Sequence, residues 1–110
     1  MSLPEVADAL GVQLREVRAM VREQRLAGVR RGENNAYAVP ADFLVDEGEG
    51  LRVLPSLRGT LIQLADAGYS EEEAVGWLFR PEESLGETPI AALRGKRTHA
   101  VRRAAQALAF

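Results

Sequence analysis

The fold of this chain can be predicted from the residues Leu3–Arg31, LPEVADALGVQLREVRAMVREQRLAGVRR. The residues at its start are typical of a helix N-terminus: Ser2 can cap the first turn, Pro4 sits where no N–H is needed, and Glu5 can complete a capping box. Gly11 then provides a residue that tolerates positive φ, and helical periodicity resumes at once. A helix, a glycine turn and a second helix predict a helix-turn-helix, whose second helix commonly enters a DNA major groove.

The second helix is expected over about residues 13–24, and its period separates two stripes. The apolar stripe, which should be buried, consists of Leu14, Val17, Met20 and Val21. The basic stripe recurs at spacings of three, four and three residues and consists of Arg15, Arg18, Arg22 and Arg25. Aligned guanidinium groups suit DNA phosphates and guanine edges. The alternative is an ordinary charged surface in which Glu16 and Glu23 pair with these arginines.

A β-hairpin is expected directly after this helix, over residues 29–39. Strand-forming residues flank the turn sequence Gly32-Glu33-Asn34-Asn35 on both sides. A hairpin in this position is a wing, and its basic and amide side chains could reach a phosphate or a minor groove: Arg30, Arg31, Asn34 and Asn35. The alternative for the two asparagines is that they serve only the turn.

The stretch after the wing suggests a domain boundary. Residues 40–44 can form a brief helix that closes the core under the wing, and the acidic segment 45–50 contains two glycines and has no periodicity. We therefore expect a winged helix-turn-helix domain over residues 1–46. The remaining residues, 51–110, are expected to form a C-terminal helical bundle, so the fold class is mainly α with a small β-hairpin wing.

The C-terminal helices are marked by capping residues and prolines at their starts and by glycines or prolines at their ends. Segments are expected near residues 57–67, 71–79, 89–94 and 98–108. Trp77 and Phe79 are expected to be core anchors of this half. The acidic residues 71–73 follow Ser70 at a helix start, where carboxylates favour the helix dipole and are most simply solvated.

Composition bounds the class of protein. The chain has 110 residues, 46% of them hydrophobic, which is enough to bury the core of one domain or two small ones. It has no cysteine, no long apolar run and no secretory pattern, so we expect a cytoplasmic protein without a membrane segment. The net charge is -2, but residues 12–31 hold six Arg against two Glu, a local balance of +4. Residues 42–49 hold four acids and no base, so charge is segregated along the chain.

Nothing in the sequence favours an enzyme. His99 is the only histidine, so a metal site or a catalytic triad centred on histidine has no support. Neither a glycine-rich phosphate loop nor metal-ligand spacing occurs. We expect no catalytic residues, no metal and no cofactor. A second basic cluster could extend a DNA footprint, hold an acidic partner or simply be solvated: Arg94, Lys96, Arg97, His99, Arg102 and Arg103.

Four segments resemble small actinobacterial winged helix-turn-helix DNA-binding proteins: LPEVADALGV, REQRLAGVRRG, YAVPADFL and GWLFRPEESLGETPIAALRGKRTHAVRRAAQALAF. In that family a winged helix precedes a helical domain of poorly defined role, and a mycobacterial member is a serine/threonine-kinase substrate. The resemblance implies DNA binding through the residues that correspond here to Arg15, Arg18, Arg22, Arg30 and Arg31.

Two hypotheses of different classes follow. The first is a non-enzymatic transcriptional regulator that binds double-stranded DNA with helix 13–24 in the major groove and wing 29–39 on the backbone. The second is a protein-interaction module, antitoxin-like or adaptor, because LFRPEESLGETPIAALRGKRTHAVRR is similar to the toxin-binding region of some antitoxins. In either case the C-terminal helices could bind a partner protein or a second copy. Exposed, unpaired arginines would favour DNA, whereas pairing with Glu16, Glu23 and Asp42 would favour the interaction module.

Overall fold

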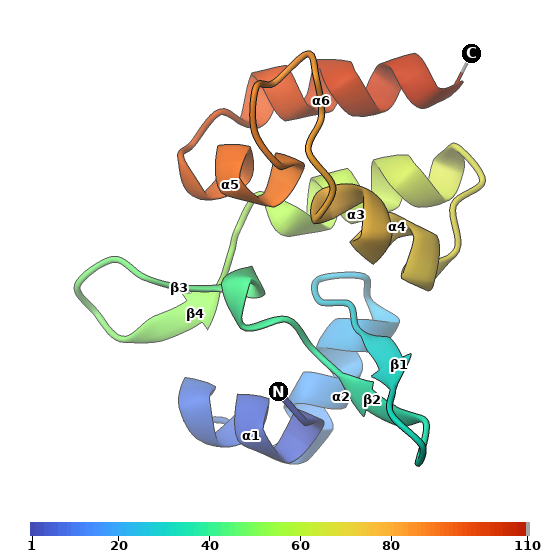
Figure 1. Cartoon of the computed structure of the whole chain (residues 1–110). Helices are drawn as coiled ribbons and strands as arrows, with labels where there is room; N and C mark the ends of the chain where they lie inside the picture. The colour runs from blue at the N-terminus through green and yellow to red at the C-terminus, as the bar shows by residue number, and fades with distance from the viewer. Residues whose placement is uncertain (110) are drawn as a thin grey trace.

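The computed structural model describes residues 1–109, and it is mainly helical with two short hairpins, as predicted. Figure 1 shows the N-terminal helices and the first hairpin on one side, with four helices stacked on the other. The elements are α1 Leu3–Leu10, α2 Leu14–Arg22, β1 Val29–Arg31, β2 Ala36–Ala38, β3 Leu44–Asp46, β4 Leu51–Val53, α3 Leu57–Asp66, α4 Glu71–Leu78, α5 Pro89–Arg94 and α6 Thr98–Gln106. Among these residues no helix has both the length and the apolar character that a membrane crossing needs.

The helix-turn-helix begins as its sequence predicts. The Ser2 hydroxyl accepts a hydrogen bond from the Glu5 N–H at 3.2 Å, and the Glu5 carboxylate accepts one from the Ser2 N–H at 2.7 Å. These hydrogen bonds hold the pKa of Glu5 below its ordinary value. Gly11 ends α1 with φ 69°, a left-handed conformation that favours glycine. The start of α1 therefore depends on Ser2 and Glu5, and the turn into α2 depends on Gly11.

The second helix is shorter than predicted. It ends at Arg22, two residues before the expected end, because Gln24 takes a positive φ of 61° and the chain turns there. The Arg25 N–H then donates to the Met20 carbonyl at 2.9 Å, which closes the helix C-terminus. Arg25 therefore lies beyond the helix, and the predicted four-arginine stripe contains only three helical residues.

Two antiparallel hairpins follow. The wing is confirmed, with Arg30 paired to Tyr37 and Val29 to Ala38 across β1 and β2. The second hairpin, β3–β4, was not predicted: it forms at the expected domain boundary, where the sequence has no periodicity, and residues 51–53 form a strand where the C-terminal half was expected to be helical. Its strands have three residues each, too few to show a period, and two glycines with positive φ make the turn, Gly48 and Gly50.

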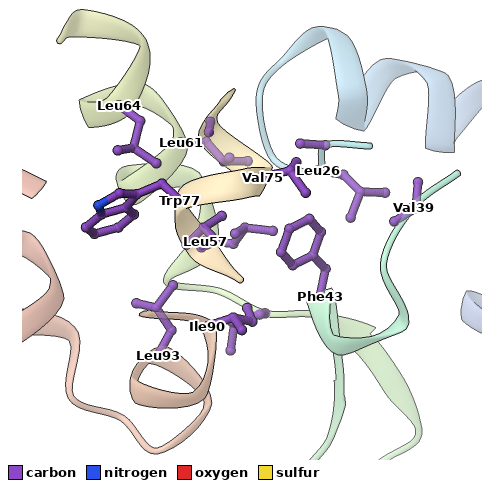
Figure 2. Packing of buried hydrophobic residues seen from close by; sticks show 14 of the residues in the cluster. Leu26, Val39, Phe43, Leu57, Leu61, Leu64, Val75, Trp77, Ile90 and Leu93 are labelled. Carbon is purple, nitrogen blue, oxygen red and sulfur yellow. The ribbon is translucent and has the colours of Figure 1, made fainter. Parts of the chain in front are cut away.

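The hydrophobic core runs through both halves of the chain. Phe43 is fully buried, and Figure 2 shows it facing Leu57 of α3 and Val75 of α4. Trp77 is buried, as predicted. Phe79 corrects its prediction: it is 37% exposed, because it lies at the C-terminal end of α4 and covers Phe43 with one side of its ring, at a centroid distance of 5.6 Å.

Candidate nucleic-acid interface

Three arginines of α2 form an exposed stripe. Arg15, Arg18 and Arg22 are all exposed, and at about 100° per residue they lie within an arc of about 60° around the helix axis. Val17, on the other side of the helix, is fully buried in the core. The buried face therefore fixes the direction in which the three guanidinium groups point, away from the protein.

These three arginines have no carboxylate partner within 4.0 Å in the part of the chain that the structure describes. Glu16 is engaged elsewhere, since its carboxylate accepts a hydrogen bond from the Gln13 N–H at 3.2 Å. Arg25 differs, because its Nε lies 3.2 Å from the Glu23 carboxylate. The stripe on α2 is thus uncompensated positive charge, whereas Arg25 is locally neutralised.

The wing adds two exposed arginines with different environments. Arg30 lies over the ring of Tyr37, 5.7 Å from its centroid, and donates a hydrogen bond to the Asn35 carbonyl at 3.2 Å. Arg31 is the next strand residue and therefore projects from the opposite face of the hairpin. Asn34 is exposed in the turn, and Asn35 takes a positive φ of 53°, so at least Asn35 serves the turn.

Glu71, for which the sequence predicted only a solvated carboxylate at a helix start, ties the wing to the C-terminal half. The Glu71 carboxylate, at the start of α4, accepts hydrogen bonds from the Gly28 N–H at 3.1 Å and from the Tyr37 hydroxyl. Burial, and then the hydrogen bond to Glu71, raise the pKa of Tyr37 well above its usual value. No local pattern reveals this contact, because its partners are 43 and 34 residues away in sequence.

Two C-terminal arginines hold other parts of the N-terminal half. Arg58 Nε of α3 donates to the Glu23 carbonyl at 3.1 Å, at the C-terminal end of α2. Arg94 of α5 donates to the carbonyl oxygens of Asp42 and Leu44 at 2.8 and 2.7 Å. The C-terminal helices therefore contact the end of α2, the wing and the segment that leads into the second hairpin.

Three of the six residues of the second basic cluster contact other parts of the chain. Besides Arg94, Arg97 donates to Glu87 and to the Leu85 carbonyl, and Lys96 lies 3.9 Å from the Glu47 carboxylate. The exposed members that remain are His99, Arg102 and Arg103. Within residues 1–109, moreover, no group of three or more acidic or histidine side chains is arranged to hold a metal ion. The α2 stripe and the wing together hold five exposed arginines that have no carboxylate partner within 4.0 Å among the described residues.

Comparison with known proteins places both halves in one family. The family described as "DNA-binding protein Rv2175c, wHTH domain" matches residues 1–44, and the one described as "Rv2175c C-terminal domain of unknown function" matches residues 54–109. The chain is 36% identical to the DNA-binding protein Rv2175c of Mycobacterium tuberculosis, over 98% of this chain and 79% of that protein. The NMR structure of Rv2175c superposes with a TM-score of 0.85 at 35% identity, over 99% of this chain and 80% of the other.

The chain therefore belongs to the Rv2175c family, with a winged helix-turn-helix at its N-terminus and the family's C-terminal helical domain after it. The predicted resemblance to an actinobacterial family is confirmed. The second hairpin, residues 44–53, covers the whole interval between the two matched ranges, residues 45–53.

Proposed function

We propose that this member of the Rv2175c family is a non-enzymatic regulator that binds duplex DNA. Helix α2 enters the major groove with Arg15, Arg18 and Arg22, and the β1–β2 wing contacts the backbone with Arg30 and Arg31. The observation that carries the proposal is the exposed α2 stripe without carboxylate partners among the described residues. The name of the M. tuberculosis relative and the matched domain agree with it.

The remaining predicted contacts have different weights within this proposal. Arg25 lies past the helix end and is paired with Glu23, so it contributes less than the stripe. Asn34 is exposed at the wing tip and can donate to a phosphate or to a base edge. The interaction-module alternative required pairing of the arginines with Glu16, Glu23 and Asp42. Only the pair between Arg25 and Glu23 occurs among the described residues.

A single winged helix covers only about 600–1,000 Å² of protein surface, so one copy should bind non-specific DNA weakly, with a Kd of roughly 1–100 µM at physiological salt. If five arginines meet phosphates, the slope of log affinity against log salt should be about -4 to -5. Fluorescence anisotropy on random duplex DNA at several salt concentrations measures this slope. A slope near zero would contradict the proposal.

Replacing Arg18 and Arg22 by alanine tests the stripe itself. We expect affinity to fall by roughly ten- to fiftyfold and the slope to flatten by about two, because two phosphate contacts are lost. The matched control is Arg102→Ala with Arg103→Ala, which removes two exposed arginines from α6 and should change binding far less. If the two double variants lose the same affinity, binding depends only on the net charge of the protein, and the proposed interface is refuted.

A further inference from the structure

One carboxylate of the C-terminal half contacts the wing at two points, the residue before β1 and the middle of β2. The Glu71 side chain accepts from the Gly28 N–H, just before β1, and from the Tyr37 hydroxyl, in the middle of β2. A hydrogen bond to a carboxylate is stronger than a neutral one. The first turn of α4 therefore fixes the position of the whole hairpin relative to the rest of the molecule.

The ring of the same tyrosine, Tyr37, lies against one of the arginines of the proposed DNA interface, Arg30. Arg30 is the register partner of Tyr37, and its guanidinium lies 5.7 Å from the centroid of the phenol ring. The Arg30 Nη1 atom also donates a hydrogen bond to the Asn35 carbonyl in the wing turn. The position of the Arg30 charge thus depends on where the Tyr37 ring lies, and Glu71 holds the hydroxyl of that ring.

Close packing against Gly28 also leaves the Tyr37 ring little freedom. An added Cβ on Gly28 would lie 2.5 Å from the Ala38 carbonyl oxygen and 2.7 Å from the Tyr37 ring. The ring is therefore packed against the Gly28 backbone, with its hydroxyl on Glu71. Since the pKa of Tyr37 is raised, the phenol remains protonated and continues to donate this hydrogen bond at neutral and moderately alkaline pH.

We propose that Glu71 is a positioning residue for DNA binding: through Tyr37 it holds Arg30 where a phosphate can meet it. This inference rests on the proposed function. It gives the C-terminal domain a defined part in DNA recognition, although none of its own residues need touch the nucleic acid. Residues 71–73 are exposed, as the sequence predicts, but Glu71 also makes hydrogen bonds to the wing that the sequence does not predict.

The neighbouring Glu72 provides a test in which the two mechanisms predict opposite signs. Glu72 lines the same surface groove as Arg30 and Arg31, but its side chain has no hydrogen-bond partner in the described part of the chain. A carboxylate near the wing repels DNA, so removing either acid should strengthen binding if only charge matters. If Glu71 positions Arg30, its removal should weaken binding even though a negative charge is lost.

The experiment measures DNA affinity and salt slope for Glu71→Ala, Glu72→Ala, Arg30→Ala and the Glu71→Ala, Arg30→Ala double variant. We expect Glu71→Ala to weaken binding roughly three- to tenfold, and the same change to have almost no effect once Arg30 is absent. Glu72→Ala should bind DNA as tightly as the wild type or more tightly. Tighter binding by Glu71→Ala, or an undiminished effect of Glu71→Ala without Arg30, would overturn the inference.

A second variant keeps the test valid if Glu71→Ala folds poorly. Tyr37→Phe retains the ring beneath Arg30 and removes only the hydroxyl, so it should weaken binding in the same direction. Thermal unfolding checks that each variant is folded, and amide exchange at Gly28 reports whether the contact with α4 has opened. Failure of the wild type to bind DNA would refute the proposed function and this inference together. Wild-type binding with unchanged Glu71→Ala and Tyr37→Phe would refute the inference alone.

Discussion

The two hairpins of this molecule share a backbone plan and differ in charge. Each pairs two antiparallel strands of three residues, and each has residues with positive φ in its turn. The β1–β2 wing carries Arg30 and Arg31 on exposed strand positions, whereas β3–β4 carries Arg52 beside Glu47 and has an acidic turn. Topology alone therefore does not make a wing, because DNA contact requires positive charge that no carboxylate neutralises.

The hairpins also differ in how they are held. The wing is tied to α4 by Glu71, with Gly28 packed against the Tyr37 ring. The tip of the second hairpin is held mainly by its own side chains: Arg52 donates to Glu47 at 2.8 Å, and the Gly48 N–H donates to Asp46 at 2.9 Å, while the exposed Lys96 lies 3.9 Å from Glu47. We therefore expect changes in the wing to alter both stability and DNA binding, and changes in the second tip to act locally.

The largest difference between the hairpins, in both stability and DNA affinity, is expected when a glycine of each is replaced by alanine. Gly28→Ala places a Cβ 2.5 Å from a backbone oxygen, which cannot move aside cheaply, so we expect roughly 1–3 kcal/mol of destabilisation and loss of DNA affinity. Gly48→Ala meets open space but must adopt φ 102°, so it should cost about 1 kcal/mol and leave DNA affinity unchanged. Urea unfolding and anisotropy on the same samples would distinguish them. Equal effects of the two changes on stability and DNA affinity would contradict the proposed difference between the hairpins.

The next largest difference between the hairpins is expected when their arginines are removed, because DNA affinity should fall for the wing and not for the second hairpin. Arg30→Ala with Arg31→Ala should lower DNA affinity roughly tenfold and flatten the salt slope by about two. Arg52→Ala removes an equally exposed arginine from the second hairpin, but one already paired with Glu47, and should leave the slope nearly unchanged. Salt titrations of both variants measure this. A comparable fall for Arg52→Ala would mean that the second hairpin also meets DNA.

The smallest effect concerns acid sensitivity of the second hairpin. The hydrogen bond from Arg52, and then its charge, hold the pKa of Glu47 below the 4.5 of an ordinary glutamate. A lowered folded-state pKa stabilises the fold above the unfolded pKa, and this contribution disappears as pH falls through the folded value. Arg52→Ala should raise the pKa of Glu47 toward 4.5, and its stability deficit should shrink below about pH 4. An NMR titration of Glu47 that shows no rise would contradict the pairing.

Local patterns predicted most of the helices and the wing because the residues that begin and end these elements lie within or beside them in the sequence. Ser2, Gly11, Ser70 and Thr88 act within three or four residues of the helix ends that they mark, so a reader of the sequence can place them. The second hairpin was missed because three-residue strands show no period. The end of α2 was misplaced because Gln24, not a glycine, adopts the left-handed conformation there. The roles of the DNA-contact residues remain predictions.

The sequence by itself determined the winged helix-turn-helix, the helical C-terminal half and the concentration of arginines between residues 15 and 31. Each of these depends on residues that are neighbours along the chain or one helical turn apart. Only the tertiary structure decided which charges remain unpaired and which side chains join the halves. Glu71, Arg58 and Arg94 look like surface charges in sequence, because their partners lie 34 or more residues away and become neighbours only when the shared core forms.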